Sequence, residues 1–177
     1  MANQSDFDIV IVGGGAVGSA VASLLGQITK IAQGAKQPIK IALIESQMPP
    51  QFDPSQVDPR VAALTEKTRL IFEQIGIWNR VVEKRTCAYR AMNVWDAEGT
   101  GRITFDCQQV QQSNLGHIVE NSALVSSLVE HIKKQPNIEL FCPANIVNYQ
   151  LHDDAIRLSI DDHSVLSAQL LIAADGA

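Results

Sequence analysis

Glycines near the N-terminus have the spacing of a nucleotide-binding turn. Gly13, Gly15 and Gly18 form a G-x-G-x-x-G pattern that directly follows the apolar residues 9–12. Gly13 can take a tight turn, Gly15 lets the backbone approach a diphosphate, and Gly18 lets a helix pack closely on a strand. A helix beginning at Ala16 would offer unpaired N–H groups and the positive end of its dipole. The pattern predicts a dinucleotide site; the alternative is a strand–turn–helix unit without a ligand.

An acidic residue follows the next predicted strand. Residues 39–44 are mostly apolar and lead directly into Glu45. In a dinucleotide fold, an acid at this strand end accepts hydrogen bonds from the adenosine ribose hydroxyls. Glu45 lies further from Gly18 than the roughly 20 residues that are usual, which a long helix and loop before Pro38 would explain. The alternative is a solvated charge at a strand end.

The remaining elements alternate in a way that indicates an α/β fold. The first helix is predicted over residues 16–31, followed by a loop over residues 33–38. Four prolines make residues 47–59 an irregular loop, after which Thr65 can cap a helix that ends before Gly76. Asn121 or Ser122 can cap a further helix, between short strands at residues 118–119 and 138–141.

Three stretches favour antiparallel pairing instead. Residues 89–96 and 102–106 predict a hairpin joined by a turn at residues 98–101. Residues 146–151, 155–160 and 164–168 predict a small meander, and residues 170–174 predict a last apolar strand that leads to Asp175 and Gly176. Such a strand normally feeds a further element. The end of the chain at Ala177 therefore suggests a piece of a longer protein.

Composition excludes several classes of function. The 177 residues carry a formal net charge of -5, and no basic stripe for nucleic acid is present. No stretch approaches the roughly 20 apolar residues that span a bilayer, and the N-terminus does not resemble a secretory signal. Cys87, Cys107 and Cys142 match no metal pattern and suit a reducing compartment, so a cytoplasmic location is expected.

Four motifs, in order along the chain, resemble the N-terminal part of FAD-dependent aromatic monooxygenases of the para-hydroxybenzoate hydroxylase type. They are GGGAVG with Glu45, DPRVAAL at residues 58–64, GHIVEN at residues 116–121, and LLIAADGA at residues 170–177. Together with IGIW at residues 75–78, the second and third motifs are most similar to the ubiquinone-biosynthesis hydroxylases. The first motif alone is shared by many flavin and nicotinamide enzymes.

The resemblance implies FAD in a Rossmann-like fold, with a parallel sheet and a small antiparallel meander. The glycine loop (Gly13, Gly15, Ala16, Gly18) would face the FAD diphosphate, and Glu45 the adenosine ribose. Arg60 would reach the cofactor near the diphosphate and flavin, where its cationic fork suits phosphate oxygens; the alternative is a surface charge. Asn121 would lie beside FAD or simply cap its helix. Asp175 would lie near the diphosphate, the alternative being an ordinary turn.

The resemblance also implies a domain division and a reaction. Residues 1–80 and 113–177 would form the FAD-binding domain, and residues 81–112 the first hairpin of an incomplete β-rich substrate domain. The whole enzyme would use NAD(P)H and O2 to hydroxylate the ring of a polyprenylated phenol. It would work beside other ubiquinone-biosynthesis proteins and in peripheral contact with a membrane. The fragment alone would be inactive.

No side chain is nominated as a catalytic acid, base, nucleophile or metal ligand, because the cofactor supplies the reactive atoms. The four histidines match no metal or triad spacing: His117, His131, His152 and His163. Two alternatives stay open. One is another FAD oxidoreductase, such as a halogenase or amine oxidase, and the other is a non-catalytic FAD-binding or complex-forming subunit. Ring position, the choice of NADH or NADPH and the oligomeric state are not determined by the sequence.

Overall fold

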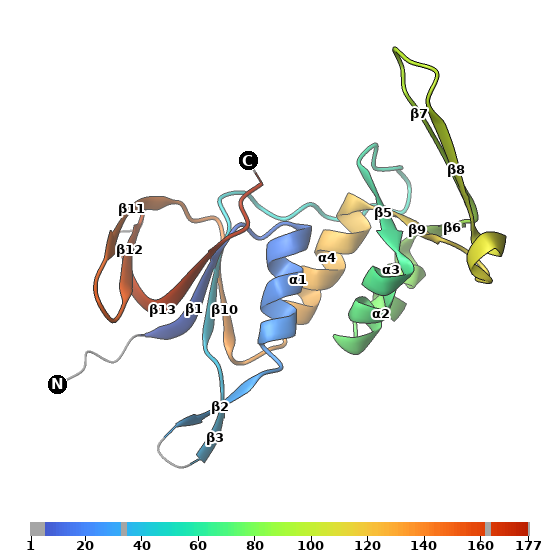
Figure 1. The fold of residues 1–177 in the computed structure, drawn as a ribbon. Helices are drawn as coiled ribbons and strands as arrows, with labels where there is room; N and C mark the ends of the chain where they lie inside the picture. Colours follow the sequence, from blue (N-terminus) through green and yellow to red (C-terminus); the bar gives the residue numbers. More distant parts are fainter. Residues whose placement is uncertain (1–5, 33–34, 162–163, 177) are drawn as a thin grey trace. The chain divides into compact units, whose positions relative to one another are not determined.

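The computed structural model describes residues 6–32, 35–161 and 164–176 (Figure 1). The chain divides into two compact units. Met1–Gln51 together with Val125–Ala177 make up one, here called the sheet unit, and Phe52–Leu124 make up the other, here called the ribbon unit. The boundary falls inside helix α4 (Asn121–Ile132). The two units are defined by which residues pack together. The predicted division into an FAD-binding domain and a substrate domain at residues 81–112 is a separate matter and stays a prediction.

A mixed six-stranded sheet forms the centre of the sheet unit, with strand order β10-β4-β1-β13-β12-β11. Strands β10, β4, β1 and β13 are parallel, and β12 and β11 continue the sheet antiparallel. The strand bounds are β1 Phe7–Val12, β4 Ile41–Ile44, β10 Ile138–Phe141, β11 Ile146–Leu151, β12 Ile156–Ile160 and β13 Val165–Ala173. The predicted α/β class with a parallel sheet and an antiparallel extension is confirmed.

At β1 both faces of this sheet are buried, as the apolar run of that strand predicts. Val10 packs in a cluster with the meander residues Leu158 and Leu166. Ile11, the next residue, points to the opposite face and packs with Ala22 of helix α1 (Ala16–Leu25) and Ile132 of α4. Because successive side chains of a strand point to opposite faces, two full layers are needed to bury both. Figure 1 shows α1 on one face and the curled β11–β12 pair on the other.

The first helix is shorter than predicted. It ends at Leu25, and the N–H of Gly26 closes it by bonding to the carbonyls of Ala22 and Leu24. The predicted helix to residue 31 and the predicted loop at residues 35–38 are wrong; residues 33–34 lie outside the described residues. Strand β2 (Thr29–Ala32) pairs antiparallel with β3 (Ala35–Pro38). The β-branched residues of β2 favour a strand over a further helical turn.

The last two predicted strands are one. β13 runs unbroken through residues 165–173, so the separation of residues 164–168 from residues 170–174 is wrong. The strand pairs antiparallel with β12 through Ala168 and parallel with β1 from Ala168 onward. It therefore joins the meander and the parallel strands in one sheet.

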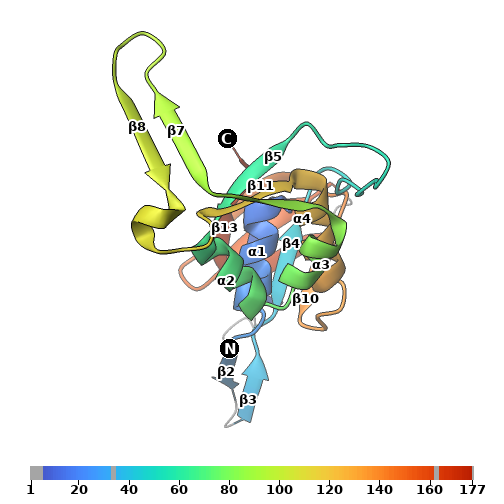
Figure 2. The ribbon, with the colours of Figure 1, turned by 90° about the vertical axis from the view of Figure 1, so that its right-hand side faces the viewer.

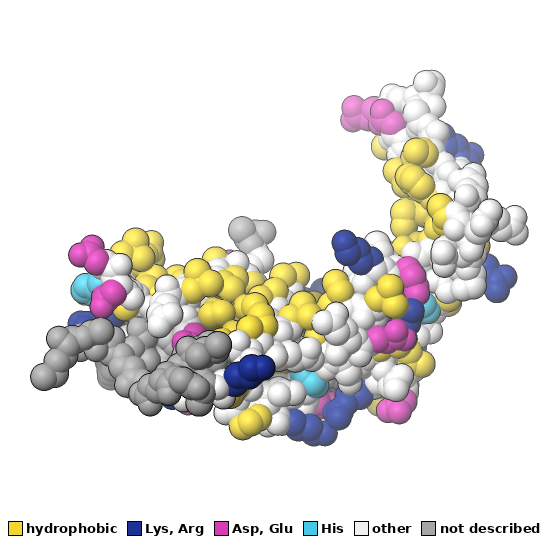
Figure 3. All heavy atoms as spheres, turned by 60° about the horizontal axis from the view of Figure 1, so that its bottom comes forward, with side chains coloured by type: hydrophobic (Ala, Val, Ile, Leu, Met, Phe, Trp, Pro, Cys, Tyr) yellow, Lys and Arg dark blue, Asp and Glu magenta, His cyan; other side chains and the backbone are white. Residues whose placement is uncertain are grey.

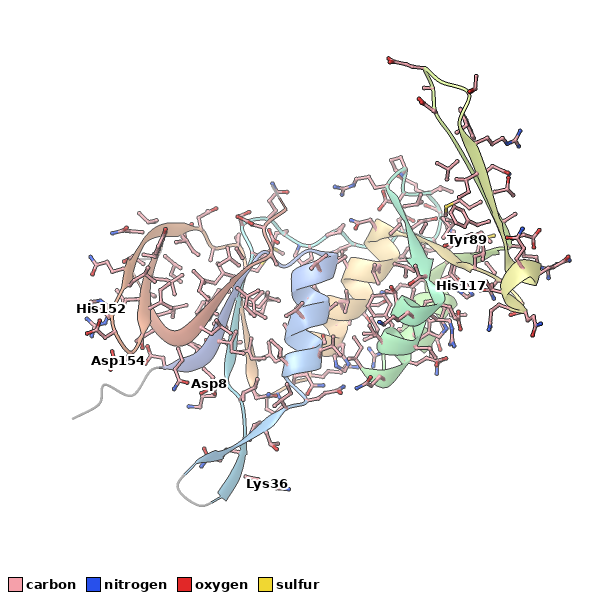
Figure 4. All side chains as sticks on the ribbon, viewed as in Figure 1. Asp8, Lys36, Tyr89, His117, His152 and Asp154 are labelled. Carbon is pink, nitrogen blue, oxygen red and sulfur yellow. The ribbon has the colours of Figure 1, made fainter. Side chains whose placement is uncertain are left out.

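A three-stranded sheet with order β5-β9-β6 lies in the ribbon unit, and two helices accompany it. The bounds are β5 Val61–Thr65, α2 Glu66–Gln74, α3 Trp78–Lys84, β6 Thr86–Tyr89 and β9 Gly116–Glu120. The predicted cap of α2 is confirmed, since Thr65 accepts a hydrogen bond from the N–H of Thr68. Strand β5, however, begins inside the DPRVAAL motif and was not predicted. Figure 4 shows Tyr89 and His117 on the paired strands β6 and β9.

Strands β7 (Ala91–Trp95) and β8 (Arg102–Asp106) form a separate two-stranded sheet, here called the ribbon (Figure 2). The 3-10 helix η1 (Cys107–Val110) follows it. The predicted hairpin is confirmed, although Tyr89 belongs to β6. The ribbon has one apolar face, on which Met92 pairs with Phe105 and Val94 with Ile103. Each of these four side chains is at least 36% exposed, and Figure 3 shows hydrophobic side chains gathered along one side of the ribbon.

Candidate functional site

The carboxyl ends of three parallel strands meet at the glycine loop. The N–H of Gly13 donates to the carbonyl of Ile44 at the end of β4, at 2.8 Å. The N–H of Ala174, just after β13, donates to the carbonyl of Val12 at 2.7 Å. Gly13 has φ +101°, and an added Cβ would collide with the backbone of Ala174. Only glycine therefore fits the turn that joins these three ends.

Gly18 and Gly15 have opposite surroundings. A Cβ on Gly18 would overlap the carbonyl oxygen of Gly13, so the missing side chain is what lets α1 approach the turn. At Gly15, which caps α1, no atom of a described residue other than the local backbone and the two chain neighbours lies within 4 Å of the Cβ position. The helix N-terminus at Gly15 and Ala16 thus opens on free space, where its N–H groups and dipole favour an anion.

Glu45 lies against this loop. Its Oε2 accepts a hydrogen bond from the N–H of Gly14 at 2.6 Å, and its Oε1 accepts one from the N–H of Gln47 at 2.8 Å. Its own N–H donates to the carbonyl of Phe141 at the end of β10, at 2.9 Å. The side chain is half-buried. Because each carboxylate oxygen can accept more than one hydrogen bond, Glu45 keeps capacity for a hydroxyl ligand.

Asp175 follows β13 on the same edge of the sheet. The Cβ position of Gly13 lies 2.7 Å from the Cα of Asp175, and the Asp175 side chain is exposed. Gly176, at φ +68°, then turns the chain. The sheet unit therefore brings together six of the predicted site residues at one edge: Gly13, Gly15, Ala16, Gly18, Glu45 and Asp175.

The other two predicted residues meet in the ribbon unit. The N–H of Asn121, the first residue of α4, donates to the carbonyl of Arg60 at 2.9 Å. The pairing continues in register from Val61 opposite Glu120. The Arg60 side chain is exposed, and its guanidinium makes no hydrogen bond with the residues that the structure describes.

Three charged residues stabilise the backbone around Arg60 and Asn121. They were not singled out from the sequence. Asp58 accepts hydrogen bonds from the N–H groups of Arg60 and Ser122, at 2.9 Å each. Glu120, whose side chain is only 6% exposed, forms an ion pair with Arg85 at 2.6 Å. One signal could have found Glu120, because a carboxylate that directly follows the apolar residues Ile118 and Val119 in a strand requires a partner when it is buried. Arg85 carries no such signal.

These contacts also set the electrostatics. Hydrogen bonds from the N–H groups of Arg60 and Ser122 lower the pKa of the Asp58 carboxyl below its usual value, and the nearby Arg60 charge acts in the same direction. Asp58 is thus held ionised at the start of α4, where a negative charge is favourable.

Other chemistry finds little support in the part of the chain that the structure describes. No group of three or more His, Cys, Asp and Glu side chains there could hold a metal ion. His117 packs edge-on against Trp78, with ring centroids 5.0 Å apart, which is a packing role. His152 lies at the β11–β12 turn near Asp154 (Figure 4), and His163 lies outside the described residues. Within the same described residues, no helix is long and apolar enough to cross a membrane.

A protein-family model described as "FAD binding domain" matches residues 6–177. The chain belongs to this family, whose members include flavoprotein monooxygenases. Its relatives include "3-demethoxyubiquinol 3-hydroxylase" of Escherichia coli K12, 32% identical over 178 aligned residues, with 100% of this chain and 43% of the relative covered. "Ubiquinone biosynthesis monooxygenase COQ6, mitochondrial" of Xenopus tropicalis is 28% identical, over 96% of this chain and 38% of the relative. The chain thus spans less than half of these relatives.

Solved structures agree on the fold. The p-nitrophenol 4-monooxygenase PnpA of Pseudomonas putida superposes with a TM-score of 0.71 at 21% identity, over 99% of this chain and 42% of that one. The flavin-dependent monooxygenase PieE, solved in complex with FAD and substrate, superposes with a TM-score of 0.68 at 18% identity, over 98% of this chain and 31% of that one.

The residues present fit FAD. The free space over Gly15 admits a diphosphate to the helix N-terminus, and a side chain at this position would occupy that space. Glu45 ends the neighbouring strand within reach of the same loop, as the ribose acceptor of a dinucleotide fold does. The predicted cofactor FAD is confirmed by the family, whereas the roles of the individual residues stay predictions.

Proposed function

We propose that this chain is the N-terminal FAD-binding part of a monooxygenase that hydroxylates the ring of a polyprenylated phenol in ubiquinone biosynthesis. The observation that supports it most is the similarity to the Escherichia coli 3-demethoxyubiquinol 3-hydroxylase along the whole chain. The intact glycine loop, with Glu45 bonded to it, adds a physical reason. The reductant would be NADH or NADPH, and O2 the oxygen source.

In this proposal the residues bind and orient the cofactor. The N-terminus of α1 at Gly15 and Ala16 would hold the diphosphate, Glu45 the ribose, and Asp175 would lie beside the diphosphate. Arg60 and Asn121 would also contact the cofactor, Arg60 through its cationic fork. FAD, when bound, supplies the redox chemistry that activates O2. No side chain of this chain is assigned a proton-transfer step.

The domain assignment belongs to the same proposal. Residues 1–80 and 113–177 would form the FAD-binding domain, and residues 81–112, which contain the ribbon, would begin the substrate domain. The exposed apolar face of the ribbon supports this, because a two-stranded sheet needs a further layer to be stable. Residues 1–177 alone would bind but not hydroxylate. The protein would act in the cytoplasm, with peripheral membrane contact and alongside other ubiquinone-biosynthesis proteins.

The test uses the complete protein as the cell makes it. The purified protein is supplied with NADH or NADPH, O2 and a prenylated phenol, and the product is identified by mass spectrometry. We expect a product that is one oxygen atom heavier, and its loss in a Gly15→Val variant, whose side chain fills the diphosphate space. A protein that retains FAD and oxidises the nicotinamide but hydroxylates no prenylated phenol would contradict the substrate assignment.

A further inference from the structure

We infer that Asp58, Glu120 and Arg85 are positioning residues that set the backbone of Arg60 so that its side chain is presented to FAD. This inference rests on the proposed contact between Arg60 and the cofactor. None of the three residues is assigned a contact with FAD. Each acts through hydrogen bonds that end on the backbone around Arg60.

Asp58 is the nearest part of this arrangement. One of its carboxylate oxygens accepts the N–H of Arg60 and the other accepts the N–H of Ser122, both at 2.9 Å. The carbonyl of Arg60 accepts the N–H of Asn121, also at 2.9 Å. The carbonyl of Arg60 is therefore bonded directly to the start of α4, and its N–H is linked there through Asp58, so that only its side chain is left to turn.

Glu120 contacts the backbone of Asp58. Its buried carboxylate accepts the N–H of Asp58 at 3.2 Å through one oxygen and pairs with Arg85 at 2.6 Å through the other. A buried carboxylate is costly unless its oxygens are satisfied by charge and hydrogen bonds. These two contacts fix the position of the Glu120 carboxylate. The hydrogen bond that it accepts from the N–H of Asp58 in turn fixes the backbone of Asp58.

Arg85 ties the proline-rich loop to the same point. Its guanidinium donates to the carbonyls of Pro54 at 2.8 Å and Gln56 at 3.0 Å, and it stacks over the ring of Phe52 at 5.4 Å from the centroid. The planar fork of arginine suits several acceptors at once, which a lysine ammonium cannot match. The loop that leads into Asp58 is therefore held at two carbonyls as well as at Glu120.

The consequence is pre-organisation. A cation on an irregular loop would otherwise lose conformational freedom when it binds an anionic cofactor, and this loss would weaken binding. Here the loop is ordered beforehand, while the Arg60 guanidinium itself is exposed. Removing a positioning residue should therefore weaken FAD binding only as long as Arg60 is present.

A double-mutant cycle in the complete protein tests this dependence. FAD dissociation constants are measured by fluorescence titration of the deflavinated protein for Arg60→Ala, Asp58→Ala and the double variant. Each single change should weaken binding about tenfold, as the loss of a charge-assisted hydrogen bond does. The FAD dissociation constant of the double variant should lie within about twofold of that of Arg60→Ala. If the two residues acted independently, the fold-changes of the two single variants would multiply instead.

Arg85 and Glu120 are tested by the same cycle with Arg60→Ala. The pair is removed together, as Arg85→Met with Glu120→Gln, so that no unpaired buried charge is left to unfold the protein. Asp58→Asn is the conservative variant; it keeps one acceptor oxygen and should restore part of the affinity lost in Asp58→Ala. The matched control is Asp106→Ala, which loses the same kind of hydrogen bond, to the N–H of Gln108, and should leave FAD affinity unchanged.

The outcomes separate the inference from the function on which it rests. If Arg60→Ala weakens FAD binding and the Asp58 effect multiplies with it, the positioning inference is overturned and the Arg60 contact stands. If Arg60→Ala leaves the affinity unchanged, the proposed contact fails and the inference fails with it. Loss of the Asp58 effect in the Arg60→Ala background, with unfolding midpoints unchanged, supports the inference.

Discussion

Apolar side chains project from paired strands in both the six-stranded sheet and the β7–β8 ribbon, with different results. In β1, Val10 and Ile11 are both fully buried because a layer covers each face. In the ribbon, Ile103 and Phe105 stay 52% and 44% exposed although their strands are paired in register. Strand pairing alone thus satisfies the backbone, but burial requires a second layer.

The largest expected effect tests this contrast directly. Leu158 is fully buried in the meander cluster, so Leu158→Ala should reduce the free energy of unfolding of residues 1–177 by about 2–5 kcal/mol. Its matched control, Ile103→Ala on the ribbon, should cost less than about 1 kcal/mol because the side chain is already half exposed. Urea denaturation measures both. Equal costs would mean that the ribbon face is covered, and the comparison would break.

A second pair of variants sharpens the comparison within the glycine loop. Gly18→Ala places a Cβ against the carbonyl of Gly13 and should cost about 1–3 kcal/mol of stability through overpacking. Gly15→Ala places its Cβ in free space and should cost about 1 kcal/mol or less. Thermal unfolding without cofactor is the measurement. Similar losses in both variants would contradict the packing difference.

Glu45→Gln tests whether the loop depends on a charge. The variant keeps the shape but weakens the hydrogen bond that Oε2 accepts from the N–H of Gly14. We expect the free energy of unfolding to fall by about 1 kcal/mol, the size of an ordinary hydrogen bond. The free energy of FAD binding should weaken by more than this. Calorimetric titration with FAD, with Glu139→Gln on the same sheet as control, measures the second effect. Unchanged affinity would remove Glu45 from the proposed cofactor site.

The smallest expected effect is a pH dependence in the ribbon unit. Hydrogen bonds lower the pKa of Asp58 in the folded protein, so its contribution is present above the unfolded pKa of about 4. It is lost as the pH falls through the lower, folded pKa. The unfolding midpoint of Asp58→Asn should therefore change less between pH 5 and pH 3 than that of the unchanged protein. Circular dichroism measures both midpoints. Parallel curves for the two proteins would exclude Asp58 as a cause.

Much of the sheet unit could be predicted, because its signals are local. Strand β10 was placed at its observed bounds, and the helix predicted to begin at Asn121 or Ser122 is α4, which begins at Asn121. The end of α1 and the β2–β3 hairpin were missed, because Gly26 and the β-branched residues after it compete with an apolar helical pattern. The unbroken β13 was missed because its two halves have different partners.

The site divides in the same way. The glycine loop and Glu45 could be found from spacing, and the structure places them together. The contacts among Asp58, Glu120 and Arg85 could not be found from spacing, because they join segments that are distant in the sequence. Spacing carries information about a turn, whereas an ion pair between separate strands and loops depends on the fold that brings them together.

The pairing of β1 with β13 has a consequence for how the chain acquires its fold. Asp6 and Ser167 bond to each other across 161 positions of sequence, and the parallel pairing of β1 with β13 begins at the next residue of each. During synthesis, the edge of β1 that pairs with β13 stays unpaired until nearly all of these residues have left the ribosome. Contacts of such sequence separation form slowly, and an unpaired strand edge attracts other chains. A molecular chaperone that shields β1 in this interval should raise the yield of folded protein.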